Sequence, residues 1–131
     1  MRPELRLPDY LRHMQEAAQN ILRYTADMDK ATFLSDSRTQ QAVYFNFVIL
    51  GEASTKLMAA YADFLAQHPQ VPWRGIRDMR NQVAHGYFTV DTSVVWSTLQ
   101  VALPDLLAKL PAIIANADLK AVLGDSSGAA S

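Results

Sequence analysis

Apolar residues in the first thirty positions recur at alternating steps of three and four residues. The members of this stripe are Leu11, Met14, Ala18, Ile21, Thr25 and Met28. Such spacing places side chains on one face of a helix, so the pattern predicts an amphipathic helix from Asp9 to about Met28. Pro8 and Asp9 supply its start signal.

A second, longer stripe follows Ser37-x-x-Gln40, which has the spacing of a capping box at a helix start. Its apolar members are Val43, Phe47, Leu50, Ser54, Leu57 and Tyr61. The pattern predicts a helix from Ser37 to about Gln67.

Two features inside this second helix bear on packing. Gly51 marks either a close approach of another helix or a slight kink. Glu52 and Lys56 stand four residues apart in the favourable order, so we expect a surface ion pair between them.

A break at residues 68–72, His-Pro-Gln-Val-Pro, precedes a third, shorter helix that should end at Gly86. Its inward residues are predicted to be Trp73, Ile76, Met79 and Val83. Arg80 lies outside this stripe, so we expect it to be free to face a cleft.

Asp91 is expected to cap a fourth helix that runs towards Ile114. Pro104 and Pro111 lack an amide proton and should kink or segment it. Small polar residues near the end predict a flexible C-terminal tail over 117–131. No strand-like alternation is present, so residues 1–116 are predicted to form one all-α domain, an up-down four-helix bundle with a kinked last helix.

Composition limits the chemistry. The 131 residues suffice for one domain, and the absence of cysteine excludes disulfides, thiolate catalysis and zinc-thiolate sites. No apolar run has the length of a signal peptide or of a membrane span, so we expect a soluble, cytoplasmic protein without a membrane partner.

Charge is distributed unevenly. The net charge of −1 argues against broad, nonspecific coating of nucleic acid. Between Gln70 and Val90, however, Arg74, Arg77 and Arg80 face only Asp78. We expect Arg74 and Arg77 to bind RNA or a nucleotide beside Arg80, although three arginines on a solvated helix face would give the same pattern.

The residues best suited to catalysis or ligand binding form the string Arg80-Asn-Gln-Val-Ala-His85-Gly-Tyr87. Arginine holds a phosphate through a planar fork of donors, and histidine can move a proton near neutral pH. Tyrosine supplies a hydroxyl that can be modified. These groups favour phosphodiester or nucleotide chemistry. The alternative is structural: Arg80 as a surface ion-pair partner and His85 as a residue capping the helix C-terminus.

Helix geometry restricts how Arg80 and His85 could act together. Five residues turn through about 500°, which leaves the two side chains roughly 140° apart. Either the helix ends before His85, or a second copy of the protein completes the site across a two-fold axis. Both can apply.

RNA carries its own nucleophile, the 2′-hydroxyl, so its cleavage requires no metal in principle. His85 would move the proton while Arg80 stabilises charge on the phosphoryl oxygens. Asn81 could hold the other nitrogen of His85 or bind a phosphate oxygen; alternatively it is a helix-surface amide. His13, His68 and His85 lack metal-ligand spacing, and we assign no metal and no cofactor.

Landmarks along the chain resemble the HepT-like branch of the HEPN superfamily, small all-helical proteins with an Arg-x4-6-His motif. In order, these are Asp9-Tyr-Leu-Arg-His-Met-Gln-Glu-Ala, Tyr24-Thr25, Phe33-Leu34-Ser-Asp-Ser-Arg-Thr-Gln40, Ile49-Leu-Gly-Glu-Ala53, Val71-Pro-Trp73, Met79-Arg-Asn81, His85-Gly-Tyr-Phe88, Val90-Asp91, Val95-Trp96 and Leu103-Pro104. They cover about residues 9 to 110.

The resemblance implies a homodimeric toxin of a toxin–antitoxin pair that acts as a metal-independent endoribonuclease on RNA. It implies Arg80 and His85 as catalytic residues, with Asn81 assisting. It also implies an antitoxin partner, a minimal nucleotidyltransferase of the MNT (MntA-like) type, which transfers AMP from ATP to Tyr87.

The chain departs from the family pattern at one position. Where relatives often have Arg-Asn before the Ile-Gly-Glu-Ala segment, this chain has Phe45-Asn46. Loss of that cation could weaken RNA binding, or the position could serve packing alone. A function of another class also stays open: a noncatalytic adaptor that binds a nucleotide or a nucleotidyltransferase and cuts nothing.

Overall fold

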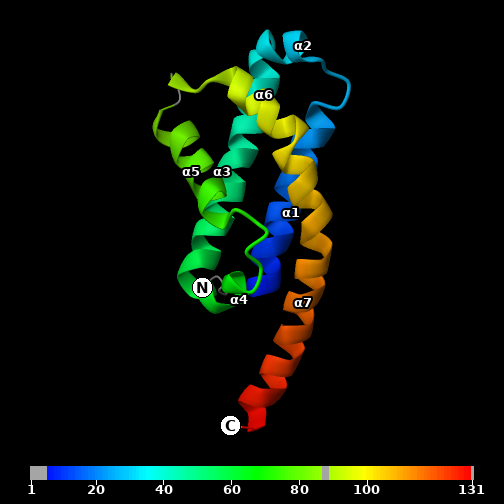
Figure 1. Cartoon of the computed structure of the whole chain (residues 1–131), viewed down its shortest axis with the longest axis vertical. Coiled ribbons are helices and arrows are strands. Elements are labelled where there is room, and N and C mark those ends of the chain that lie inside the picture. Colours follow the sequence, from blue (N-terminus) through cyan, green and yellow to red (C-terminus); the bar gives the residue numbers. More distant parts are fainter. Residues whose placement is uncertain (1–5, 87–88, 131) are drawn as a thin grey trace.

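The structure is a computed structural model that describes residues 6–86 and 89–130, with side chains described as far as residue 123. Its helices are α1 (Leu7–Tyr24), α2 (Lys30–Leu34), α3 (Ser37–Ala60), α4 (Ala62–Ala66), α5 (Trp73–His85), α6 (Thr92–Gln100) and α7 (Ala102–Ala130). The described residues contain no strand (Figure 1). The predicted all-α class is therefore confirmed.

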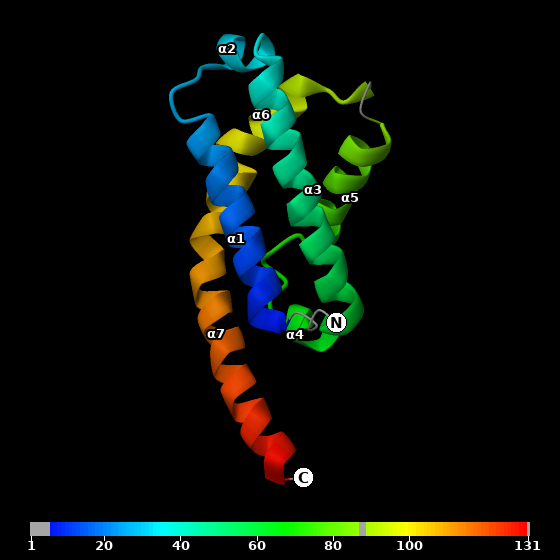
Figure 2. The same ribbon diagram turned by 180° about the vertical axis from the view of Figure 1, so that it is seen from behind.

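The long helices alternate in direction, as an up-down bundle requires. α1 packs against α3 and α7, and α3 also packs against α5 (Figures 1 and 2). The core between them is apolar, with Leu11, Met14 and Ile21 of α1 fully buried. α5, which carries the Arg-x4-His string, packs chiefly on α3 at the side of the bundle.

The connection from α1 to α3 contains a short helix that the sequence pattern did not predict. Thr25 ends α1 before Met28, and its Oγ1 donates to the Ile21 carbonyl at 2.9 Å. Asp29 then starts α2 by accepting a hydrogen bond from the Thr32 amide at 2.8 Å. This helix places Phe33 in the core, where the centroid of its ring lies 5.3 Å from that of Trp96.

The start of α3 was predicted at the right residue with the wrong cap. Asp36, not Ser37, accepts from the Thr39 amide at 3.1 Å, and Gln40 donates to the Phe33 carbonyl at 2.8 Å instead of closing a capping box. Hydrogen bonds from Thr39 lower the pKa of the Asp36 carboxyl below its ordinary value. Hydrogen bonds from Thr32 do the same for Asp29.

Two predicted long helices are interrupted. Tyr61, with φ −134° and ψ 38°, separates α3 from α4, so the second helix does not continue unbroken to Gln67. Val101 separates α6 from α7. That break lies three residues before Pro104, so Pro104 falls in the first turn of α7. In the first turn a backbone N–H makes no hydrogen bond within the helix, so the proline costs no such bond. Pro111 lies inside α7 without ending it.

α7 continues past the predicted domain boundary at residue 116. Ala117 is fully buried, and the helical backbone extends to Ala130, beyond the end of α1 (Figure 2). Flexibility of residues 117–131 stays a prediction. Within the described residues, no helix is long and apolar enough to cross a membrane.

Candidate functional site

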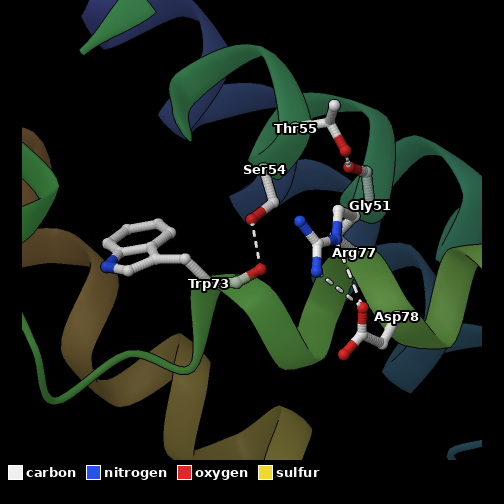
Figure 3. A network of polar contacts seen from close by, with 6 residues as sticks. All are labelled: Gly51, Ser54, Thr55, Trp73, Arg77 and Asp78. Carbon is white, nitrogen blue, oxygen red and sulfur yellow. Dashed lines mark hydrogen bonds and ion pairs between the residues drawn. The ribbon is translucent and has the colours of Figure 1, made fainter. Parts of the chain in front are cut away.

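The N-terminal end of α5 is fixed to α3 by one buried hydrogen bond. Ser54 is fully buried, and its Oγ donates to the Trp73 carbonyl at 2.6 Å (Figure 3). The Trp73 indole in turn donates to the His68 carbonyl at 3.0 Å. The first of these contacts joins α5 to α3, and the second joins the start of α5 to the segment that precedes it.

Gly51 allows the two helices to approach closely one turn further along. A Cβ built at Gly51 would lie 2.0 Å from the Arg80 Cβ and 3.1 Å from the Ile76 carbonyl oxygen. No side chain fits in that space. Of the two interpretations of this glycine, close helix packing is therefore the one that the structure supports.

Arg80 lies in this contact and not off the inward stripe, so that prediction was wrong. The four predicted inward residues of α5 are confirmed, because Trp73 and Val83 are buried and Ile76 and Met79 are partly buried against the core. Arg80 lies beside them in the contact with α3. The Arg80 side chain is only 20% exposed because Gly51 leaves room for its stem. Met79 packs against the core and also lines an apolar pocket of ≈ 230 Å³ with Leu50 and Leu103.

The Arg80 guanidinium is incompletely satisfied. Its Nη2 lies 3.7 Å from the Glu52 Oε2, which is an ion-pair distance but too long for a hydrogen bond. Its Nε is buried and has no hydrogen-bond partner among the described residues. A buried donor without a partner is costly, so this head group is suited to an additional anion. The expected pair between Glu52 and Lys56 is not among the ion pairs of the described part, where Glu52 faces Arg80.

His85 is the last residue of α5 and is exposed; Gly86 follows as the C-cap, as predicted. The helix therefore does not end before His85, and the first of the two alternatives is wrong. The rotation of about 140° between Arg80 and His85 persists. Asn81 lies between their directions, about 100° from Arg80, and is half-buried.

The other two arginines of α5 differ in their surroundings. Arg77 donates from Nε and Nη2 to Asp78 Oδ1 at 3.2 Å and 3.0 Å, so much of its charge is balanced by a neighbour on the same helix (Figure 3). Arg74 is exposed and makes no ion pair with any residue in the described part. The predicted basic segment is thus less cationic than its composition indicates.

Comparison with known proteins places this chain in a family. The family described as "Ribonuclease HepT-like" matches residues 14–113. This chain belongs to the HepT-like family. The resemblance read from the sequence landmarks is confirmed.

Individual relatives agree with this HepT-like assignment. "Probable ribonuclease HepT" of Thermococcus cleftensis is 39% identical over 77% of this chain and 89% of the relative. "Putative RNase MJ0127" of Methanocaldococcus jannaschii is 31% identical over 80% of this chain and 84% of the relative. No solved structure matches the chain.

The remaining candidates of this HepT-like chain lie apart from the string or outside the described residues. Tyr87, the predicted modification site, lies outside them. His13 is exposed on α1. His68 lies two residues after the end of α4, and its Nε2 is 3.0 Å from Asn116 Nδ2. The described residues contain no group of three His, Asp or Glu side chains that could hold a metal ion.

Proposed function

We propose that this HepT-like protein is a metal-independent endoribonuclease and the toxin of a toxin–antitoxin pair. The observation that carries the proposal is the state of Arg80, a partly buried arginine whose buried Nε has no hydrogen-bond partner among the described residues. It stands five residues before an exposed histidine on the same helix. Buried cationic donors of this kind suit a phosphate. Family membership supports RNA as the substrate.

In the proposed reaction the 2′-oxygen of the ribose attacks the adjacent phosphorus, and the bond from phosphorus to the 5′-oxygen breaks. His85 accepts the proton from the 2′-hydroxyl, and a protonated His85, the same residue or that of the second protomer, donates a proton to the leaving 5′-oxygen. Arg80 stabilises the negative charge that develops on the phosphoryl oxygens. Asn81 orients His85 or binds a phosphate oxygen. The products are a 2′,3′-cyclic phosphate end and a 5′-hydroxyl end.

A homodimer completes the site in this proposal. Because Arg80 and His85 diverge by about 140° on one straight helix, a single protomer does not direct both at the same phosphate. A two-fold axis beside α5 brings a second set of these residues across one groove. Arg74 and Arg77 then contact the RNA backbone along the same helix.

The proposed antitoxin is a minimal nucleotidyltransferase of the MNT type that transfers AMP from ATP to Tyr87. Tyr87 lies two residues after His85 in sequence. An AMP group there adds bulk and a negative phosphate close to the motif. The modified tyrosine therefore competes with RNA for Arg80 and blocks the groove.

The deciding experiment is cleavage of a labelled RNA panel in EDTA, comparing the wild type with His85→Ala. Cleavage by the wild type alone, with 2′,3′-cyclic phosphate ends, supports the nuclease. Equal cleavage by both proteins, or by neither, contradicts it. In that case a noncatalytic adaptor that binds a nucleotide or the nucleotidyltransferase becomes the better account, and calorimetry with ATP tests it.

A further inference from the structure

Phe45 on α3 is placed differently from the other phenylalanines for which burial is described. Its side chain is 65% exposed, whereas Phe33, Phe47 and Phe64 are each at most 4% exposed. Leaving a ring of this size in water forfeits the stabilisation that burial supplies. The position therefore does not serve packing within one protomer, and the ring is accessible to a ligand or a partner.

Helix geometry places Phe45 on the same face as His85. Gly51 of α3 lies against Arg80 of α5. From that contact, Phe45 is about 9 Å along α3 and His85 about 7.5 Å along α5, in the same direction because the helices are antiparallel. About the axis of its own helix, Phe45 is rotated by about 120° from the Gly51–Arg80 contact, and His85 is rotated in the same sense by about 140°. Because the two helices are antiparallel, equal senses of rotation bring both residues to the same side of the helix pair.

Glu52 provides an independent check of this placement. It lies at about 100° on the same side of α3 and reaches the Arg80 guanidinium at 3.7 Å. The face that carries Phe45 is therefore the face towards which the Arg80 head group extends. The apolar pocket lined by Leu50 and Met79 lies on the opposite flank.

One helical turn from Phe45 lie Gln41, which is exposed, and the partly exposed Ala42, Val48 and Ile49. Two or three turns away, the exposed residues of α3 include Arg38, Glu52 and Lys56. Arg38 precedes Phe45 by two helical turns. Its guanidinium makes no hydrogen bond or ion pair with a described residue, although its charge contributes to the lowered pKa of Asp36. The core of an interface between protein copies is depleted in charged residues. An exposed aromatic ring between cations is instead typical of single-stranded nucleic-acid binding.

We propose that Phe45 stacks on a nucleobase of single-stranded RNA beside the cleaved phosphate, and that Arg38 binds the phosphate of a neighbouring nucleotide. This inference rests on the proposed nuclease function. The stacked base positions the strand so that the scissile phosphate lies in the groove between the Arg80 and His85 sets of the two protomers. Because any base presents a flat face, the contact tolerates many sequences and selects for unpaired RNA.

The test uses full-length His85→Ala, which should bind RNA without cutting it, and single-stranded oligonucleotides from the panel that carry 2-aminopurine. Stacking quenches 2-aminopurine fluorescence. In this background Phe45→Ala should raise the Kd roughly 5- to 100-fold and remove the quenching, whereas Phe45→Trp should retain both. Tyr24→Ala is the matched control, because Tyr24 is a 41% exposed aromatic on α1 with Arg23 over its ring.

The outcomes separate this inference from the function on which it rests. If the protein binds RNA with the same Kd and quenching after Phe45→Ala, the stacking role is wrong and the nuclease stands. If no RNA binds to His85→Ala or to the wild type, both fail. Light scattering gives a third outcome. If Phe45→Ala converts a dimer to monomers and bound RNA is still quenched, the ring belongs to a protein interface and the proposal is overturned.

Discussion

Arg80 and Gly51 occupy a single contact between α5 and α3, in which an added Cβ on the glycine would come within 2.0 Å of the arginine Cβ. This relationship explains how a charged residue lies on the buried face of a helix. The missing side chain at Gly51 makes room for the arginine stem, and the head group then extends towards Glu52. Fold and proposed chemistry are therefore coupled at one point of helix packing.

Gly51→Ala should destabilise the protein and reduce RNA cleavage. The new methyl group cannot be accommodated unless α5 shifts, since the atom it meets is close to the backbone of Arg80. Overpacking of this kind costs about 1–3 kcal/mol in the free energy of unfolding. Urea denaturation measures this loss of stability.

Gly75→Ala is the matched control on the exposed side of α5, where a Cβ would lie 3.6 Å from Pro72 Cβ. This substitution should be neutral or should stabilise the protein by up to about 1 kcal/mol. Equal destabilisation by both substitutions would contradict the packing argument.

Arg80→Ala should lower kcat for RNA cleavage by roughly 100- to 1000-fold, the usual effect of removing a donor that stabilises transition-state charge. Arg77→Ala is the comparison on the same helix. Because Arg77 is paired with Asp78, its loss should raise KM and leave kcat largely unchanged. Circular dichroism and light scattering of both variants check that the helices and the assembly persist. The same kcat for Arg80→Ala and the wild type would remove Arg80 from the mechanism.

Incubation with the nucleotidyltransferase partner, ATP and magnesium should add the mass of one or more AMP groups to the chain. The adduct should be absent from Tyr87→Phe, because the phenolic oxygen is the proposed acceptor. Intact-mass spectrometry measures this directly, and the modified protein should no longer cut RNA. An adduct that survives Tyr87→Phe places the modification on another residue.

The differences between prediction and structure have specific physical causes. The inward residues Trp73, Ile76, Met79 and Val83 were predicted correctly, but the partial burial of Arg80 was not predicted. The decisive fact is the proximity of Gly51, twenty-nine residues away in sequence, which periodicity does not report. The α2 helix was missed because five residues are too few for a periodic signal. Its indications were the Asp29 to Thr32 spacing and the apolar Phe33.

What could be predicted depended on local signals. The end of α5 at Gly86 and the start of α6 after Asp91 follow from capping chemistry, and both were correct. The pairing of Glu52 with Arg80 had no such signal, since it joins two helices. The separation of Arg80 and His85 by about 140° could be derived in advance, because it depends only on helix geometry.

The cap at Asp36 should make stability depend on pH in the acid range. Hydrogen bonds from Thr39 lower the pKa of Asp36 in the folded state, so its contribution is fully present above the unfolded pKa, near 3.8, and is lost as the pH falls through the lower folded value. Asp36→Ala should therefore lower the Tm at pH 7 and differ little from the wild type near pH ~2, where the carboxyl is protonated.

Asp36→Asn keeps an acceptor that does not titrate, so its Tm should stay close to that of the wild type at pH 7 with less dependence on pH. Thermal melts of the three proteins between these pH values measure the effect, with Asp27→Asn as a control in the preceding turn. An Asp36→Ala deficit that is the same at both pH values would show that the ionised carboxylate does not provide the stabilisation.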